Sequence, residues 1–159
     1  MPKRDFNVAI MHGHSNAWQT VEQWVQEAGF TPRVLIKEFE AGVIFERLRD
    51  IIWDEIHCVV VIMSADDKIN KKIFRARQNV VFELGYCFGA FDSLDDNGHF
   101  TAEDAIIFLK EENVEIFANI HGLTYVEYNR RSLWRKKQFF TGILNSAFEK
   151  ARQVYRELR

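Results

Sequence analysis

Cysteine and proline are scarce in this sequence, which has two of each among 159 residues. Cys58 and Cys87 lie in apolar stretches. We therefore expect two reduced core residues, and neither a disulfide framework nor a zinc site of four spaced ligands. The prolines, at positions 2 and 32, fall outside every helix and strand predicted below. That placement is consistent with the predicted elements, because proline interrupts helices and central strands.

A large excess of one charge is also missing. The formal net charge is −2, from 21 Lys and Arg residues against 23 Asp and Glu residues. This balance argues against a duplex nucleic-acid partner, and the short basic run at 130–137 is typical of a solvated helix start. The longest apolar run, Cys58–Met63, is far too short to span a bilayer, and no long apolar region follows the first five residues. We expect a cytoplasmic protein that does not bind a membrane.

Apolar and aromatic residues are abundant, at 47% and 14% of the chain, which is ample for the core of one domain. Apolar runs predict strands near Asn7–Met11, Arg33–Lys37, Cys58–Met63, Ala105–Leu109 and Thr124–Tyr128. Helical periodicity predicts helices near Ala17–Ala28, Val43–Glu55, Asn79–Phe91 and Leu133–Leu158, and the polar segment Asp92–Glu103 predicts a surface loop. The alternation indicates an α/β fold of three layers. Its five-stranded parallel sheet would have the flavodoxin-like order 2-1-3-4-5.

Ligands of such a sheet bind beyond the carboxyl ends of the strands, where the strand order reverses. For this order, that point lies between the first and third strands. The polar residues that follow these strands are His12, Gly13, His14 and Ser15, and Ser64, Asp66 and Asp67. We expect both groups to face one crevice.

Each of these residues also has a plainer interpretation. Gly13 and the helix that follows it suit an anion, but a glycine here is equally typical of a tight strand-to-helix turn. His12 and His14 lack further ligands at metal-site spacing, so we expect no metal. Asp66 and Asp67 are also typical of a solvated loop. The usual glycine-rich mononucleotide and dinucleotide motifs are absent, so any nucleotide is held in another way.

The segment with the most information surrounds Glu83, the only charged residue from Gln78 to Phe91. With Asn79 as the helix N-cap, Glu83 falls on the flank of an apolar stripe, beside Val80 and Cys87. A carboxylate in such a place usually has a partner or a function. The alternative is an acid favoured by the helix dipole, although the fourth helical position fits a capping box imperfectly.

Other features of this segment have two interpretations as well. Arg75 and Arg77, just before the helix, suit phosphate groups or solvent equally well. Gly85 and Gly89 would each weaken a helix by up to about 1 kcal/mol relative to alanine. We expect close packing at both glycines to compensate.

Arg75–Tyr86 is very similar to the signature of bacterial TIR-like proteins once described as predicted nucleotide-binding proteins. These include the TIR effectors of antiphage systems triggered by cyclic nucleotides. The resemblance extends to His12–His14, Ser64–Asp67 and Ile120–Tyr125, and so covers most of the chain as a single TIR-like domain, residues 1–159. It implies an NAD glycohydrolase that releases nicotinamide and ADP-ribose or a cyclic variant. Glu83 then matches the catalytic glutamate, and Asn79 faces the same pocket.

Under that interpretation NAD is a substrate, and no cofactor is expected. We expect the dinucleotide to contact His12–Ser15, Ser64, Asp66, Asp67 and Arg77, with Gly42 in the loop after the second strand and Phe45 stacking on a ring. The resemblance also implies self-association when active, and a sensor in another domain or subunit. This sequence lacks the family's usual threonine after Gly42. The alternatives are a non-enzymatic TIR scaffold and an enzyme resembling a nucleoside deoxyribosyltransferase.

Overall fold

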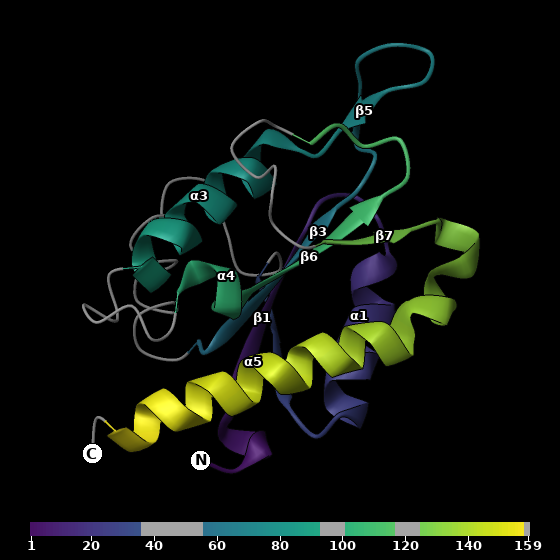
Figure 1. Ribbon diagram of the computed structural model, residues 1–159. Helices are drawn as coiled ribbons and strands as arrows, with labels where there is room; N and C mark the ends of the chain where they lie inside the picture. Colours follow the sequence, from purple (N-terminus) through teal and green to yellow (C-terminus); the bar gives the residue numbers. More distant parts are fainter. Residues whose placement is uncertain (36–55, 93–100, 117–124, 158–159) are drawn as a thin grey trace.

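The computed structural model describes residues 1–35, 56–92, 101–116 and 125–157 (Figure 1). Its elements are η1 (Lys3–Asp5), β1 (Asn7–His12), α1 (Ala17–Glu27), β2 (Thr31–Val34), β3 (Cys58–Met63), β4 (Asp67–Lys68), β5 (Phe74–Arg75), α3 (Gln78–Asp92), α4 (Ala102–Ala105), β6 (Ile106–Glu111), β7 (Tyr125–Tyr128), η4 (Arg130–Lys136) and α5 (Lys137–Glu157). The predicted helix near Val43–Glu55 lies outside the described residues.

The main sheet has five parallel strands in the order β2-β1-β3-β6-β7. Because β6 and β7 correspond to the fourth and fifth predicted strands, this is the predicted order 2-1-3-4-5. Helices α1 and α5 contact each other, and so do α3 and α4. Figure 1 shows α3 and α1 on opposite sides of the sheet, and α4, which also contacts α5, lies between α3 and α5. The predicted three-layer α/β fold is confirmed.

The core lies on both faces of the central strands. All six residues of β3 are buried, as are all six of β6. A strand that is covered on both faces needs apolar side chains on both, which explains why the sequence here shows no alternation. The carboxyl ends of β1 and β3 are thereby held side by side, with Met11 opposite Val61 and His12 opposite Ile62.

Strand β2 starts earlier than predicted and contains Pro32, so the prediction that both prolines fall outside regular elements was wrong. Pro32 lies opposite Val8 in the pairing of β2 with β1. Strand β2 is at the edge of the sheet that the structure describes. An edge strand tolerates proline, because only one of its sides must supply hydrogen bonds.

Three further details differ from the prediction. Helix α4 lies where a loop continuing to Glu103 was expected, and it begins with a capping box in which Thr101 and Asp104 bond reciprocally. The final helix is divided, because Ser132 has non-helical angles within η4 and α5 begins only at Lys137. Strands β4 and β5 form a short antiparallel hairpin, which projects from the carboxyl edge of the sheet (Figure 1).

Candidate active site

Glu83 lies in the second turn of α3, not in its first turn. The helix begins at Gln78, and the carbonyl of Arg77 accepts hydrogen bonds from the N–H groups of Val80 (3.0 Å) and Val81 (3.3 Å). Arg77 therefore occupies the N-cap position that was predicted for Asn79, and that prediction was wrong. As the sixth helical residue, Glu83 cannot close a capping box and lies beyond the turn where the helix dipole acts most strongly.

The surroundings of Glu83 agree with the predicted flank position. Val80, Leu84 and Cys87 are buried, whereas Glu83 is half-buried. Burial raises the pKa of the Glu83 carboxyl, and the charge of Arg77 opposes that rise in part. Burial, followed by the charge of Glu83, raises the pKa of the Cys87 thiol. Cys87 is therefore a neutral neighbour of the carboxylate and not a thiolate nucleophile.

Asp66 connects the loops that leave β1 and β3 to the start of α3. Its Oδ1 atom accepts hydrogen bonds from the backbone N–H of His14 (3.1 Å) and from the hydroxyl of Ser64 (3.0 Å). Its Oδ2 atom accepts a longer bond, 3.4 Å, from the backbone N–H of Arg77. The loops that leave β1 and β3 therefore meet at Asp66, through its contacts with His14 and Ser64.

Gly13 is required by the same carboxylate. A Cβ atom built at Gly13 would lie 1.7 Å from Oδ2 of Asp66, far inside any allowed contact. No small adjustment relieves such an overlap, because Asp66 is itself held by its hydrogen bonds. Position 13 therefore requires glycine because its backbone lies against the side chain of Asp66.

His12 and His14 point to different surroundings. The ring of His12 is buried and stacks on Trp18, with centroids 5.1 Å apart, and its Nδ1 atom lies 2.7 Å from the carbonyl oxygen of Gly13. Burial lowers the pKa of His12, which favours the neutral ring. His14 is exposed. No group of three or more His, Cys, Asp or Glu side chains suited to a metal occurs within the described part of the chain.

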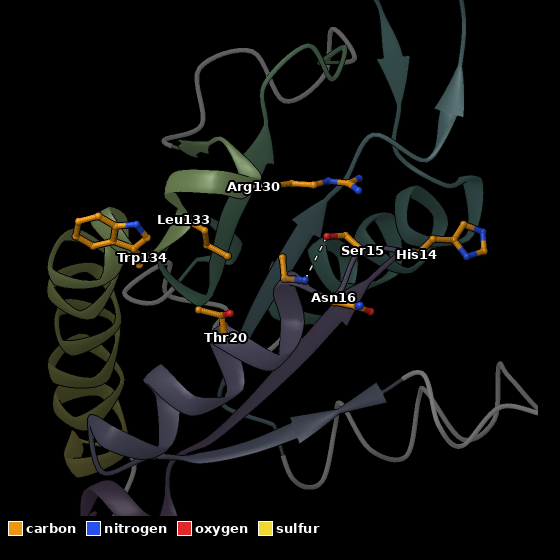
Figure 2. A pocket seen from close by; sticks show the side chains of 8 residues that line it. His14, Ser15, Asn16, Thr20, Arg130, Leu133 and Trp134 are labelled. Carbon is orange, nitrogen blue, oxygen red and sulfur yellow. Dashed lines mark hydrogen bonds between the residues drawn. The ribbon is translucent and has the colours of Figure 1, made fainter.

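A cavity of about 460 Å³ opens beside the start of α1 (Figure 2). Its lining residues are His14, Ser15, Asn16, Ala17, Thr20, Arg130, Leu133 and Trp134. Sequence reasoning missed the contribution of Arg130 and Trp134. The available signal was the basic run at 130–137, which we interpreted as a solvated helix start.

Arg130, which lines this cavity, belongs to a second polar cluster around Glu111. Its carboxylate accepts from Nε (2.5 Å) and Nη2 (3.0 Å) of Arg130 and from the backbone N–H of Ala65 (2.9 Å). The hydroxyl of Tyr128 is buried near Ser15 and has no hydrogen bond of acceptable geometry among the described residues. Burial, and then the charge of Glu111, raise the pKa of Tyr128, so its hydroxyl stays protonated.

Comparison with known protein families assigns most of this chain to one family. Residues 7–130 match the family described as "CAP12/Pycsar effector protein, TIR domain". The chain belongs to this TIR-domain family. The match begins at β1 and ends at the first residue of η4, so it includes Glu83 and the loops joined by Asp66.

Two individual proteins are also similar to this chain in sequence. The TIR domain is 26% identical to "Uncharacterized protein YuaY" of Escherichia coli (strain K12) over 137 residues, which cover 82% of this chain and 42% of that protein. It is 30% identical to "Protein tirC" of Dictyostelium discoideum over 138 residues, which cover 76% of this chain and 63% of that protein. The chain therefore spans only part of the length of each relative.

The structure places the remaining predicted site residues of the TIR domain as follows. Ser64 is buried and bonded to Asp66, while Asp67 is exposed on β4. Arg77 and Asn79 are exposed at the start of α3. Gly42 and Phe45 lie outside the described residues. None of the described helices is long and apolar enough to cross a membrane.

Proposed function

We propose that this TIR domain hydrolyses NAD at the bond between nicotinamide and ribose, with Glu83 as the catalytic carboxylate. The observation that carries the proposal is the position of Glu83. It is the one acidic residue among the described positions of α3 before Asp92, it is half-buried, and no capping role accounts for it. Family membership supports the same assignment.

The chemistry suits a single carboxylate. As the bond to nicotinamide breaks, positive charge develops at the ribose C1′ atom, and a carboxylate beside it stabilises that charge. Nicotinamide leaves as a neutral molecule and needs no general acid. Water then bonds to C1′ and loses a proton, which gives ADP-ribose; attack by a group of the same molecule would give a cyclic product.

Glu83 must be ionised to act in this way. Burial raises its pKa and Arg77 lowers it, so the two effects oppose each other at the carboxylate. A carboxylate that is partly desolvated interacts more strongly with a developing cation than one in bulk water. The half-buried position therefore favours the reaction while Arg77 helps to keep the group charged.

The dinucleotide would lie between α3 and the loop after β1. Gly13, His14 and Ser15 lead into the start of α1, where the positive end of the helix dipole favours anionic groups. The exposed Arg77 adds a positive charge at the start of α3. Gly42 and Phe45 complete the proposed contacts. We further propose that the domain self-associates in its active state and acts as an effector in antiphage defence. A sensor in another domain or subunit would then trigger it.

The test is to incubate the purified protein with NAD, with and without a crowding agent, and to separate the products by chromatography. Release of nicotinamide by the wild type, and its loss in Glu83→Gln and Glu83→Ala, would support the proposal. Glu103→Gln, which changes an exposed glutamate on α4, is the matched control and should retain activity.

Two other outcomes would replace this proposal. If no product forms even at high protein concentration, the domain acts as a non-enzymatic scaffold. If bases exchange on deoxynucleosides while NAD is left intact, the enzyme is a transferase of the deoxyribosyl type.

A further inference from the structure

We infer that Asp66 is a positioning residue, which holds the loop after β1 against the start of α3 and thereby aligns the substrate loop with Glu83. This inference rests on the proposed function for its catalytic part. Its structural part can be tested separately, without turnover. It differs from the expectation that Asp66 contacts the dinucleotide.

The carboxylate of Asp66 is already engaged within the chain. Oδ1 accepts from two donors, the N–H of His14 and the hydroxyl of Ser64, and Oδ2 accepts from the N–H of Arg77. The backbone N–H of Asp66 is held as well, by the carbonyls of Ser64 (2.9 Å) and Arg75 (3.1 Å). A ligand that bonded to this carboxylate would have to compete with these donors.

The donors come from three segments that are separate in the sequence. His14 belongs to the loop before α1, Ser64 directly follows β3, and Arg77 is the N-cap of α3. Charge-assisted bonds from backbone N–H groups to a carboxylate are among the stronger hydrogen bonds in proteins. One side chain therefore fixes the spacing between the substrate loop and the helix of Glu83.

Gly13 provides independent support for this function. The 1.7 Å separation between a Cβ built at Gly13 and Oδ2 of Asp66 shows that the loop backbone lies directly against the carboxylate. A side chain at position 13 would push the loop and the carboxylate apart. Gly13→Ala should therefore reproduce the effect of losing Asp66, although it leaves the carboxylate in place.

The link to Glu83 passes through Arg77. The N–H of Arg77 is bonded to Asp66, and its carbonyl accepts the first bonds of α3. Its charge also acts on the carboxylate of Glu83. A shift of about 1 Å in the position of Glu83 relative to the substrate can reduce the rate on the order of 100-fold.

The first measurement is the steady-state kinetics of nicotinamide release by Asp66→Ala, Asp66→Asn and Gly13→Ala. A positioning residue lowers kcat on the order of 100-fold in the alanine variant while KM changes little. Asn should restore part of the rate, because its carbonyl oxygen can still accept from His14 and Ser64. Asp5→Ala, an exposed aspartate on η1, is the control and should match the wild type. A rise in KM with unchanged kcat would overturn the inference and identify Asp66 as a substrate contact.

The second measurement needs no substrate. In ¹H–¹⁵N spectra, the amide resonances of His14 and Arg77 should move together in Asp66→Asn and in Gly13→Ala. Unchanged resonances would overturn the inference even if the enzyme turns over NAD. Conversely, the wild type could release no nicotinamide while the His14 and Arg77 resonances still shift in both variants. That result would support the positioning function and reject the proposed reaction.

Discussion

The thiol of Cys87 lies 3.8 Å from the sulfur of Met11, so the helix that carries Glu83 is in direct contact with the first strand. Cys87 is one turn after Glu83 and is completely buried. Its small side chain lets α3 approach β1 closely. The distance between the carboxylate and the loop after β1 therefore depends on this packing as well as on Asp66.

Neither cysteine should react with thiol reagents in the folded protein. Both side chains are buried, and burial raises the pKa of Cys58 to about 12 and also raises the pKa of Cys87. Only the thiolate reacts, so its population at mildly alkaline pH is very small. Titration with a chromogenic disulfide should label no thiol before denaturant is added and two afterwards. Labelling of one thiol in the native protein would contradict the burial of that residue.

Glu83→Gln should raise thermal stability at neutral pH. The pKa of Glu83 is higher in the folded state than in the unfolded chain, so its ionised form disfavours folding. That penalty is present above the folded pKa and disappears as the pH falls below the ordinary glutamate pKa. Melting temperatures across this range should show a stabilising effect of Gln that fades in acid. Glu103→Gln, at an exposed position, should show no such trend.

Gly85→Ala and Gly89→Ala should each stabilise the protein by roughly 0.5–1 kcal/mol. We expected close packing at these glycines, but no described atom lies within 4 Å of a Cβ built at either one. Alanine would then lower the entropy of the unfolded chain without a clash. Denaturant unfolding measures the change. Destabilisation by either variant would show that another part of the protein packs against α3 at that glycine.

Glu111→Ala should destabilise the fold by about 2 kcal/mol, within the range for loss of charged hydrogen bonds. It removes three bonds, two from Arg130 and one from the N–H of Ala65. The adjacent Glu112 is exposed and accepts from the side chain of Asn129 (2.7 Å). Glu112→Ala is therefore the matched control, with an expected change of less than about 1 kcal/mol. Equal losses would mean that the three bonds of Glu111 add no more stability than the exposed bond between Asn129 and Glu112.

The order of the main sheet could be predicted because each long strand carries a local signal. Strand β3 is apolar at every position, and β1 and β6 each contain four consecutive apolar residues, which is typical of strands covered on both faces. The hairpin of β4 and β5 was missed, since strands of two residues are too short to show a period. Pro32 was misjudged because the second strand was predicted to begin at Arg33, whereas β2 begins at Thr31; the predicted order had already placed this strand at an edge, where proline is tolerated.

Glu83 could be selected from the sequence because its isolation within an apolar helix is a local property. Its sixth position in α3 could not be fixed, since the start of the helix at Gln78 depends on bonds to Arg77. Arg130 and Trp134 were likewise missed at the cavity beside α1. Their run in the sequence resembles any solvated helix start, and only the packing of η4 near α1 shows what they line.

The sequence by itself determined the layers, the strand order and the one isolated carboxylate, because hydrophobic periodicity and charge are properties of neighbouring residues. Only the tertiary structure decided what Asp66 and Gly13 do. The bonds of Asp66 join it to residues 52 positions earlier and 11 positions later, and its contact with Gly13 excludes any side chain there. Such contacts form between loops that are far apart in the sequence and close together only in the folded sheet. Local sequence patterns therefore do not predict them.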